Sequence, residues 1–279
     1  MHAYSNLTMK PPKQYPSLSR EKFKEICANS YEPFVIKNLA EHWPLVKQAK
    51  QSESGAFNHL QGIAANATMK LTRIPSDAEG RMFYSTDMQR MNFGTAQLPA
   101  AECFKRMSGC VDDADYAVQS APVKHYFPEL APTLNNTLLD DSIEPLIWIG
   151  NHIVVAPHFD EFDNIAVVAV GKRRFTLFPP EQVANLYVGP LEYTPAGQPI
   201  SLVNIKAPDV NMHPNYTLAH AAGLSVELEP GDAIYIPTPW WHHVESLSPF
   251  NVLINYWWSD KTASTSMPFP MLLHAIQSL

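Results

Sequence analysis

Two short segments carry the side chains with the clearest metal chemistry. His158 and Asp160 stand two residues apart in APHFDEFD. Residues i and i+2 of an extended chain project from the same face, so these two can bind one ion. A third ligand is expected from PWWHHVE, where His242 and His243 are adjacent. Two imidazoles and one carboxylate on one side of an ion form the facial triad that suits non-haem Fe(II).

Strand alternation distinguishes the two adjacent histidines, because neighbouring strand residues face opposite sides. His242 shares its face with Val244 and Ser246, whereas His243 shares its face with Glu245. A narrow barrel interior suits the small and apolar set, so we expect His242 to point inward. The chain has eleven histidines, and a single one is usually a surface or hydrogen-bonded core residue. The metal hypothesis therefore depends on the combination of the three ligands.

Polar residues also stand on strands that are otherwise apolar. Arg173 shares one face with Phe175 and Leu177, and a guanidinium among inward apolar side chains needs an anion. Its planar fork is suited to a carboxylate. Asn164 and Asn255 are amides on apolar strands, and buried amides must find hydrogen-bond partners. A bound dicarboxylate would provide them, and so would neighbouring backbone groups; the pattern leaves both alternatives open.

Residues 143–259 give an almost continuous β signal, interrupted by turns. Many short strands at close spacing predict a sandwich or a barrel, and the jelly roll is the usual host for a site of inward-facing side chains. The run from Asn164 to Val170 is apolar on both faces, which suits a strand that is covered on both sides. We expect residues 200–205 (ISLVNI) to form a further strand and residues 181–188 to form the one helix of this region.

The part before this region mixes helices and strands. Helices are expected at 19–29, from 45, at 52–65 and at 99–107, and strands at 33–39, 68–74, 82–85 and 116–121. Residues 267–279 are expected to form a short apolar helix. The chain is interpreted as one domain, residues 1–279, in which 1–115 pack as an extension on a core of 116–259 and 260–279 form a tail.

Composition narrows the function classes. The net charge is −7 and no long basic run is present, so a general binder of nucleic acid or of membrane surfaces is not expected. The first residues lack the apolar core of a signal peptide, and no segment has the apolar length of a membrane span. The three cysteines are odd in number and share no metal-ligand spacing, which favours a reducing compartment. We therefore expect a cytoplasmic protein.

Three segments, HFDEFDNIAVVAVGKRRFTLFPP, PGDAIYIPTPWWHHVESL and NVLINYWW, closely resemble the Jumonji C and cupin-like family of Fe(II)- and 2-oxoglutarate-dependent oxygenases. The nearest branch contains the asparaginyl hydroxylase of hypoxia-inducible factor. The resemblance is detailed from about residue 146 to residue 259. It implies a mainly β fold, the double-stranded β-helix (jelly roll, cupin), with N-terminal and flanking α-helices. It also implies a hydroxylase that uses dioxygen and 2-oxoglutarate.

The resemblance assigns roles to individual residues. The iron ligands of the family fall on His158, Asp160 and His242, in agreement with the alternation argument. The positions that contact 2-oxoglutarate fall on Tyr116, Asn164, Arg173, Asn255 and Trp257. Two residues depart from the branch: Arg173 stands where a lysine is usual, and Val155 stands where the asparaginyl hydroxylase has a threonine.

The substrate is open at this stage. The resemblance favours hydroxylation of a protein or peptide side chain, but the same scaffold serves demethylation of methyl-lysine, modified nucleosides in RNA and small molecules, and fold similarity cannot choose between them. The acidic balance counts against nucleic acid. The alternative is a metal-binding cupin without 2-oxoglutarate oxygenase activity, either isomerase-like or a sensor. Whether the chain forms a homodimer is equally open.

Overall fold

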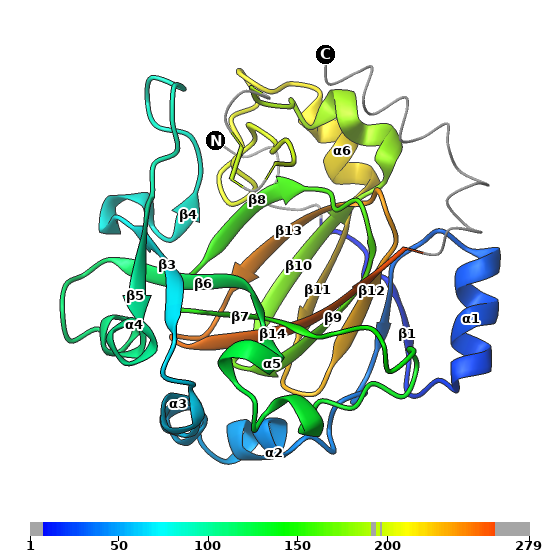
Figure 1. Ribbon diagram of the computed structural model, residues 1–279. Coiled ribbons are helices and arrows are strands. Elements are labelled where there is room, and N and C mark those ends of the chain that lie inside the picture. Colours follow the sequence, from blue (N-terminus) through cyan, green and yellow to red (C-terminus); the bar gives the residue numbers. More distant parts are fainter. Residues whose placement is uncertain (1–7, 191–193, 196, 260–279) are drawn as a thin grey trace.

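The computed structural model describes residues 8–190, 194–195 and 197–259, and it consists mainly of two β-sheets with helices outside them (Figure 1). In spatial order, the nine-stranded sheet comprises β1 (Lys13–Tyr15), β2 (Phe34–Ile36), β12 (Ala233–Ile236), β9 (Asp163–Val170), β14 (Asn251–Trp258), β7 (Leu146–Gly150), β6 (Asp115–Pro122), β3 (Thr68–Ile74) and β5 (Gly94–Pro99). The five-stranded sheet comprises β11 (Leu224–Leu228), β10 (Arg173–Phe178), β13 (Trp241–Ser246), β8 (Val154–His158) and β4 (Arg81–Met82). This is the mainly β jelly roll that the sequence predicts.

The helices are short. They are α1 (Arg20–Asn29), α2 (Pro44–Gln51), α3 (Glu53–Ile63), α4 (Ala100–Met107), α5 (Val123–Tyr126) and α6 (Tyr216–Ala222), with single 3₁₀ segments at Ser76–Ala78, Ala131–Thr133 and Pro180–Asn185. Local residues explain where they begin. The Ser19 side chain accepts a hydrogen bond from the Lys22 N–H at the start of α1, and Ser52 does the same for Gly55 at the start of α3. Pro44 opens α2, where its missing N–H is not needed.

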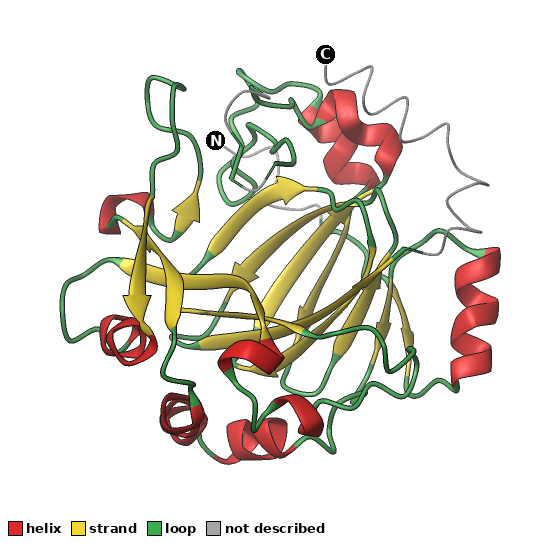
Figure 2. Ribbon diagram, viewed as in Figure 1, coloured by secondary structure: helices red, strands yellow, loops and turns green. Residues whose placement is uncertain are grey.

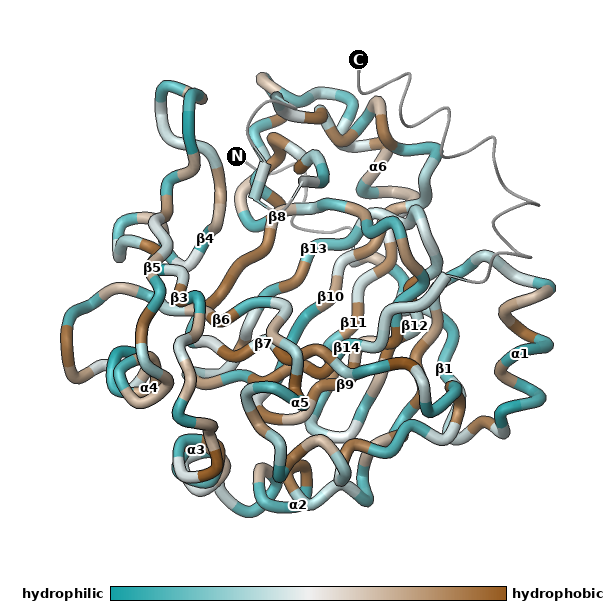
Figure 3. The backbone as a smooth tube through the Cα atoms, in the orientation of Figure 1, coloured by the Kyte–Doolittle hydropathy of each residue, from teal (hydrophilic) through white to brown (hydrophobic). Residues whose placement is uncertain are grey.

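Strand β9 separates two apolar layers. Its residues Ala166 and Val168 pack in the barrel interior, with residues of β10 such as Phe175. Ile165 and Val167 belong to the outer layer, which the helices complete. Figure 2 shows α1 to α4 outside the strands, and Figure 3 shows apolar stretches along the central strands. Each fully buried Val or Ile contributes about 1.5–3 kcal/mol to folding, so both layers hold the nine-stranded sheet in place.

Two predictions about elements are wrong. Residues 181–188 were expected to form a helix, but the structure has a 3₁₀ segment, Pro180–Asn185, and the α-helix of this region is α6. Residues 200–205 form no strand; Ser201 makes only an isolated bridge to Val188. Their apolar side chains, including Ile200 and Val203, are buried from a loop, which explains the β-like pattern.

The other predicted elements agree with the structure within a few residues, and the strand predicted at 68–74 has the same first and last residue in the structure. Strand β5 was not predicted, because its sequence GTAQLP is mostly exposed and lacks an apolar period. The expected helix at 267–279 lies outside the described residues. Among the helices of the described part, none combines the length and the apolar character that crossing a membrane requires.

Candidate metal centre and its cavity

His158, Asp160 and His242 come together at the end of the five-stranded sheet. One potential ligand atom from each lies within 4.8 Å of the others. Strands β8 and β13 pair so that His158 and His242 are direct neighbours, and their ring centroids are 4.3 Å apart. His242 Nε2 lies 3.6 Å from Asp160 Oδ2. The three side chains can therefore hold one ion.

Backbone carbonyls set the tautomer of both imidazoles. His158 Nδ1 lies 2.9 Å from the carbonyl oxygen of Ala156, and His242 Nδ1 lies 3.2 Å from that of Trp240. A carbonyl only accepts, so each Nδ1 carries the proton and donates it. Each Nε2 then keeps its lone pair for a metal, which is the usual arrangement of ligating histidines. Burial, followed by the proximity of His158, lowers the pKa of His242 to about 4, so its ring is neutral.

A corner between β12 and β13 holds the segment that carries Asp160. The Thr238 hydroxyl donates to the carbonyl oxygen of Asp160 at 2.7 Å, and the Thr238 N–H donates to Asp163 Oδ1 at 3.1 Å. The Tyr235 hydroxyl donates to the same carboxylate oxygen at 3.3 Å. The segment that carries the carboxylate ligand is thus held at both of its ends, at Asp160 and at Asp163.

Alternation along β13 correctly places its two histidines. His242 lines the cavity together with Val244. His243 faces the other side, with Glu245, whose carboxylate pairs with Arg174 Nη1 at 3.0 Å. The prediction that His242, rather than His243, joins His158 and Asp160 agrees with this geometry.

A cavity of about 270 Å³ adjoins the three ligands. Four other predicted site residues line it: Asn164, Arg173, Asn255 and Trp257. Arg173 pairs with Ser246, four residues along β13 from His242, which corresponds to about 13 Å at the usual strand rise. Apolar residues such as Phe175, Ile236 and Leu253 form much of the wall. The cavity therefore extends from the candidate metal centre to a buried cation.

Arg173 has no counter-ion in the described part of the chain. Its side chain is only 5% exposed, its Nε has no hydrogen-bond partner there, and none of its nitrogens is in an ion pair with a described residue. Burial lowers the pKa of Arg173 to about 10, so it stays charged at neutral pH. A buried charge without a partner is costly. A small carboxylate ligand would satisfy it.

The two cavity asparagines bond to each other. Asn255 Nδ2 donates to Asn164 Oδ1 at 3.0 Å. The sequence suggested a bound dicarboxylate or neighbouring backbone groups as partners, and neither alternative includes this contact between the two side chains. Asn255 Oδ1 and Trp257 Nε1 have no partner among the described residues. Val155 also lines the cavity, and it offers no hydroxyl. Polar atoms that could receive a ligand thus remain on residues that line the same cavity as Arg173.

Tyr116 is the predicted site residue that the structure does not bring to the cavity. Its ring is buried in the outer apolar layer, and its hydroxyl donates to Asp112 Oδ1 at 2.9 Å. Gln119 and Ser120 of the same strand line the cavity instead. A bulge between Val118 and Ala121 changes the alternation of β6, and Ser120 adopts a positive φ of 50° there. Two adjacent polar residues on an apolar strand were the available signal.

We predict that Tyr116→Phe leaves the affinity for 2-oxoglutarate within about twofold of the native value, because the hydroxyl is bonded to Asp112 outside the cavity. The lost hydrogen bond should lower the free energy of unfolding by about 1–3 kcal/mol. Calorimetric titration and urea denaturation measure the two quantities. A tenfold weaker 2-oxoglutarate affinity in a folded variant would instead place the Tyr116 hydroxyl on the ligand.

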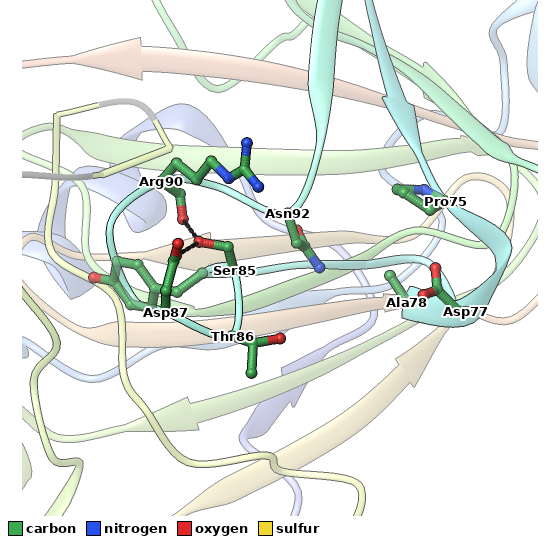
Figure 4. Close-up of a pocket in the computed structure, with 9 residues that line it drawn as sticks. Pro75, Asp77, Ala78, Ser85, Thr86, Asp87, Arg90 and Asn92 are labelled. Atoms are coloured by element: carbon green, nitrogen blue, oxygen red, sulfur yellow. Dashed lines mark hydrogen bonds between the residues drawn. The ribbon is translucent and has the colours of Figure 1, made fainter.

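A second cavity, of about 410 Å³, lies at the hairpin after β4 (Figure 4). Its lining includes Asp77, Ser85, Asp87 and Arg90, but no residue of the candidate metal centre. The Ser85 hydroxyl is engaged within the hairpin, with Asp87 Oδ1 at 2.6 Å and the Arg90 carbonyl oxygen at 2.9 Å. This larger cavity is therefore separate from the candidate site.

A protein family and several known proteins are similar to most of the chain. A family model described as "Cupin-like domain" matches residues 19–264. HSPB1-associated protein 1 from Mus musculus is 35% identical over 257 residues, which cover 85% of this chain and 50% of that protein. Jumonji C domain-containing protein 5 from Drosophila melanogaster is 23% identical over 253 residues, 89% of this chain and 59% of that protein.

tRNA wybutosine-synthesizing protein 5 from Danio rerio is 26% identical over 195 residues, which cover 62% of this chain and 56% of that protein. The chain thus spans between half and three fifths of the length of these three curated relatives.

Proposed function

Because the chain belongs to the family of cupin-like domains, we propose that it is an Fe(II)- and 2-oxoglutarate-dependent oxygenase that hydroxylates a protein side chain. The matches also confirm the resemblance to Jumonji C and cupin-like proteins. One observation carries the proposal: three ligand atoms within 4.8 Å of one another share a cavity with a buried arginine. A metal and a carboxylate ligand would satisfy both groups.

His158, Asp160 and His242 would hold the iron, and the two Nδ1–H groups that donate to backbone carbonyls keep both Nε2 lone pairs directed to it. Asp160 supplies the single negative charge of the ligand set. When bound, the iron supplies the activation of dioxygen that is coupled to decarboxylation of the 2-oxo acid. The protein contributes the orientation of the ligands and an enclosed site.

Arg173 would bind the far carboxylate of 2-oxoglutarate through two parallel N–H donors. Trp257 Nε1, which has no partner among the described residues, can donate to the same ligand, and Asn255 Oδ1 can accept from a bound water. The apolar wall, which includes Phe175, Ile236 and Leu253, limits the water around these groups. Lower local polarity strengthens each of the charge-assisted hydrogen bonds.

A protein substrate is proposed from the family resemblance and from charge. The name of the Danio rerio relative refers to a tRNA, so an RNA nucleoside is the main competitor. The net charge of −7 disfavours a polyanionic substrate, since binding to nucleic acid depends mainly on neutralising phosphates. A peptide segment carries no such requirement.

The test supplies the chain with Fe(II), 2-oxoglutarate and ¹⁸O₂, together with a peptide pool from a cell lysate or with total RNA. We expect succinate to form and one ¹⁸O atom to enter a peptide, and we expect neither in the Asp160→Ala variant. Label in a nucleoside alone would contradict the protein substrate. Metal binding without any succinate would support the other candidate, a cupin without 2-oxoglutarate chemistry. The two departures from the family branch, at Arg173 and at Val155, are the argument for that candidate.

A further inference from the structure

Three aromatic rings contact one another in sequence, from two that line the cavity to one that is exposed to solvent. Trp148 and Trp257 line the cavity and contact each other edge to face, with centroids 5.3 Å apart. Phe162 does not line the cavity, but its ring is nearly parallel to that of Trp257, at 14° and with centroids 6.4 Å apart. We call these three residues the aromatic shelf. Phe162 is its outer end.

Phe162 is one of the large apolar residues that are exposed to solvent in the described part of the chain. Its side chain is 43% exposed, although it lies two residues after Asp160 in the segment between β8 and β9. A single exposed apolar residue is ordinary on a protein surface, but this one continues a ring stack that begins inside the cavity. The Thr238 bonds to Asp160 and Asp163 hold both sides of the segment. The ring is therefore presented to solvent from a fixed support.

The segment that carries this ring is acidic. The segment Asp160–Asp163 contains three carboxylates and no basic residue. Asp160 belongs to the candidate metal centre and Asp163 accepts hydrogen bonds from Thr238 and Tyr235. Glu161 is exposed and pairs with no basic residue in the part of the chain that the structure describes. An exposed aromatic face attracts a cation, and the exposed carboxylate of Glu161 is on the residue next to it in the sequence.

From this combination we infer that Phe162 and Glu161 form a recognition subsite for the guanidinium group of an arginine in the protein substrate. The inference rests on the proposed function. A guanidinium is flat and weakly hydrated, so it stacks on an aromatic ring while its N–H groups bond to a carboxylate. Because Phe162 lies outside the cavity lining, the arginine it binds is a neighbour of the residue that enters the cavity. The subsite determines specificity and takes no part in the chemistry.

Small probes test the subsite on the full chain loaded with Zn(II) and 2-oxoglutarate. The cationic probe is Nα-acetyl-arginine N-methylamide, and its neutral isostere is the corresponding citrulline derivative. Dissociation constants come from saturation-transfer NMR titrations. We expect the arginine probe to bind about threefold to fivefold more tightly than the citrulline probe, the range of an exposed cation–π contact.

Four variants locate the effect. Phe162→Ala and Glu161→Gln should each reduce the preference for arginine, whereas Phe162→Tyr keeps an aromatic face and should retain it. Leu218→Ala is the matched control, because Leu218 is 58% exposed on α6 and takes no part in the cavity lining. The control should bind both probes as the native chain does.

Equal affinities for the two probes in the native chain would overturn the inference, and so would an unchanged preference in Phe162→Ala. Tighter binding of adenosine monophosphate than of the arginine probe would overturn it in favour of a nucleotide. The 2-oxoglutarate affinity of the native chain is measured on the same samples. If 2-oxoglutarate binds and the arginine preference is missing, only the subsite is wrong. If 2-oxoglutarate does not bind, the proposed function is wrong.

Discussion

Replacement of His242 by alanine is expected to abolish Fe(II) binding at the centre and to lower 2-oxoglutarate turnover by about a thousandfold or more. The variant keeps only His158 and Asp160 of the three atoms that lie within 4.8 Å of one another. Removing the hydrogen-bond partner of a metal ligand typically lowers metal affinity or activity 10- to 100-fold, so removing a ligand itself should lower both further. Iron content after desalting and succinate formation measure the two effects.

His243→Ala is the matched control for this variant. His243 is the next residue and is also buried, but it faces away from the cavity. Provided that circular dichroism shows both variants to be folded, the control should retain iron. Loss of iron from His243→Ala together with retention by His242→Ala would contradict the assignment of the ligands.

Arg173→Met is expected to separate cosubstrate binding from stability. It removes a charge-assisted contact to the proposed carboxylate, so the affinity for 2-oxoglutarate should fall by about 10- to 100-fold. Without ligand, however, the native chain buries this cation with no described counter-ion. Replacing a poorly compensated buried charge by an apolar side chain is often neutral or stabilising by about 1–4 kcal/mol. The ligand-free variant should therefore unfold at the same or a higher temperature.

Thermal unfolding with and without 2-oxoglutarate checks both parts. At a ligand concentration about 100 times the dissociation constant, the native chain should gain about 2.7 kcal/mol, and Arg173→Met should gain much less. Arg174→Met is the control, because Arg174 lies on the opposite face of β10 and pairs with Glu227 and Glu245. It should keep the response to 2-oxoglutarate. A normal response in Arg173→Met would show that the ligand does not contact this guanidinium.

The strict period of two along a strand explains what could be predicted about the site. On β10 and β13 the alternation is regular over Arg173, Leu177 and His242, whose pairing the register confirms. The sequence pattern therefore places these side chains on the correct face. Tyr116 was assigned to the cavity from the family resemblance and not from alternation. The structure places its ring in the outer apolar layer, whereas Gln119 and Ser120, at the bulge before Ala121, line the cavity.

Contacts between distant strands explain what the sequence could not predict. The bond between Asn164 and Asn255 depends on the pairing of β9 with β14, which sets Trp257 opposite Asn164. No local pattern specifies that register. The loop at residues 200–205 looks like a strand because its apolar residues are buried, although only Ser201 makes a bridge. Burial without a paired neighbour cannot be recognised from one sequence.

The most direct test of a shared iron and 2-oxoglutarate site is an anaerobic titration. The chain is reconstituted with Fe(II), 2-oxoglutarate is added, and the weak visible metal-to-ligand absorption band is followed. We predict that the band rises to saturation in the native chain, is absent in His242→Ala, and needs at least tenfold more 2-oxoglutarate in Arg173→Met, in line with the loss of a charge-assisted contact. Stoichiometric iron binding without any band in the native chain would contradict the proposed function.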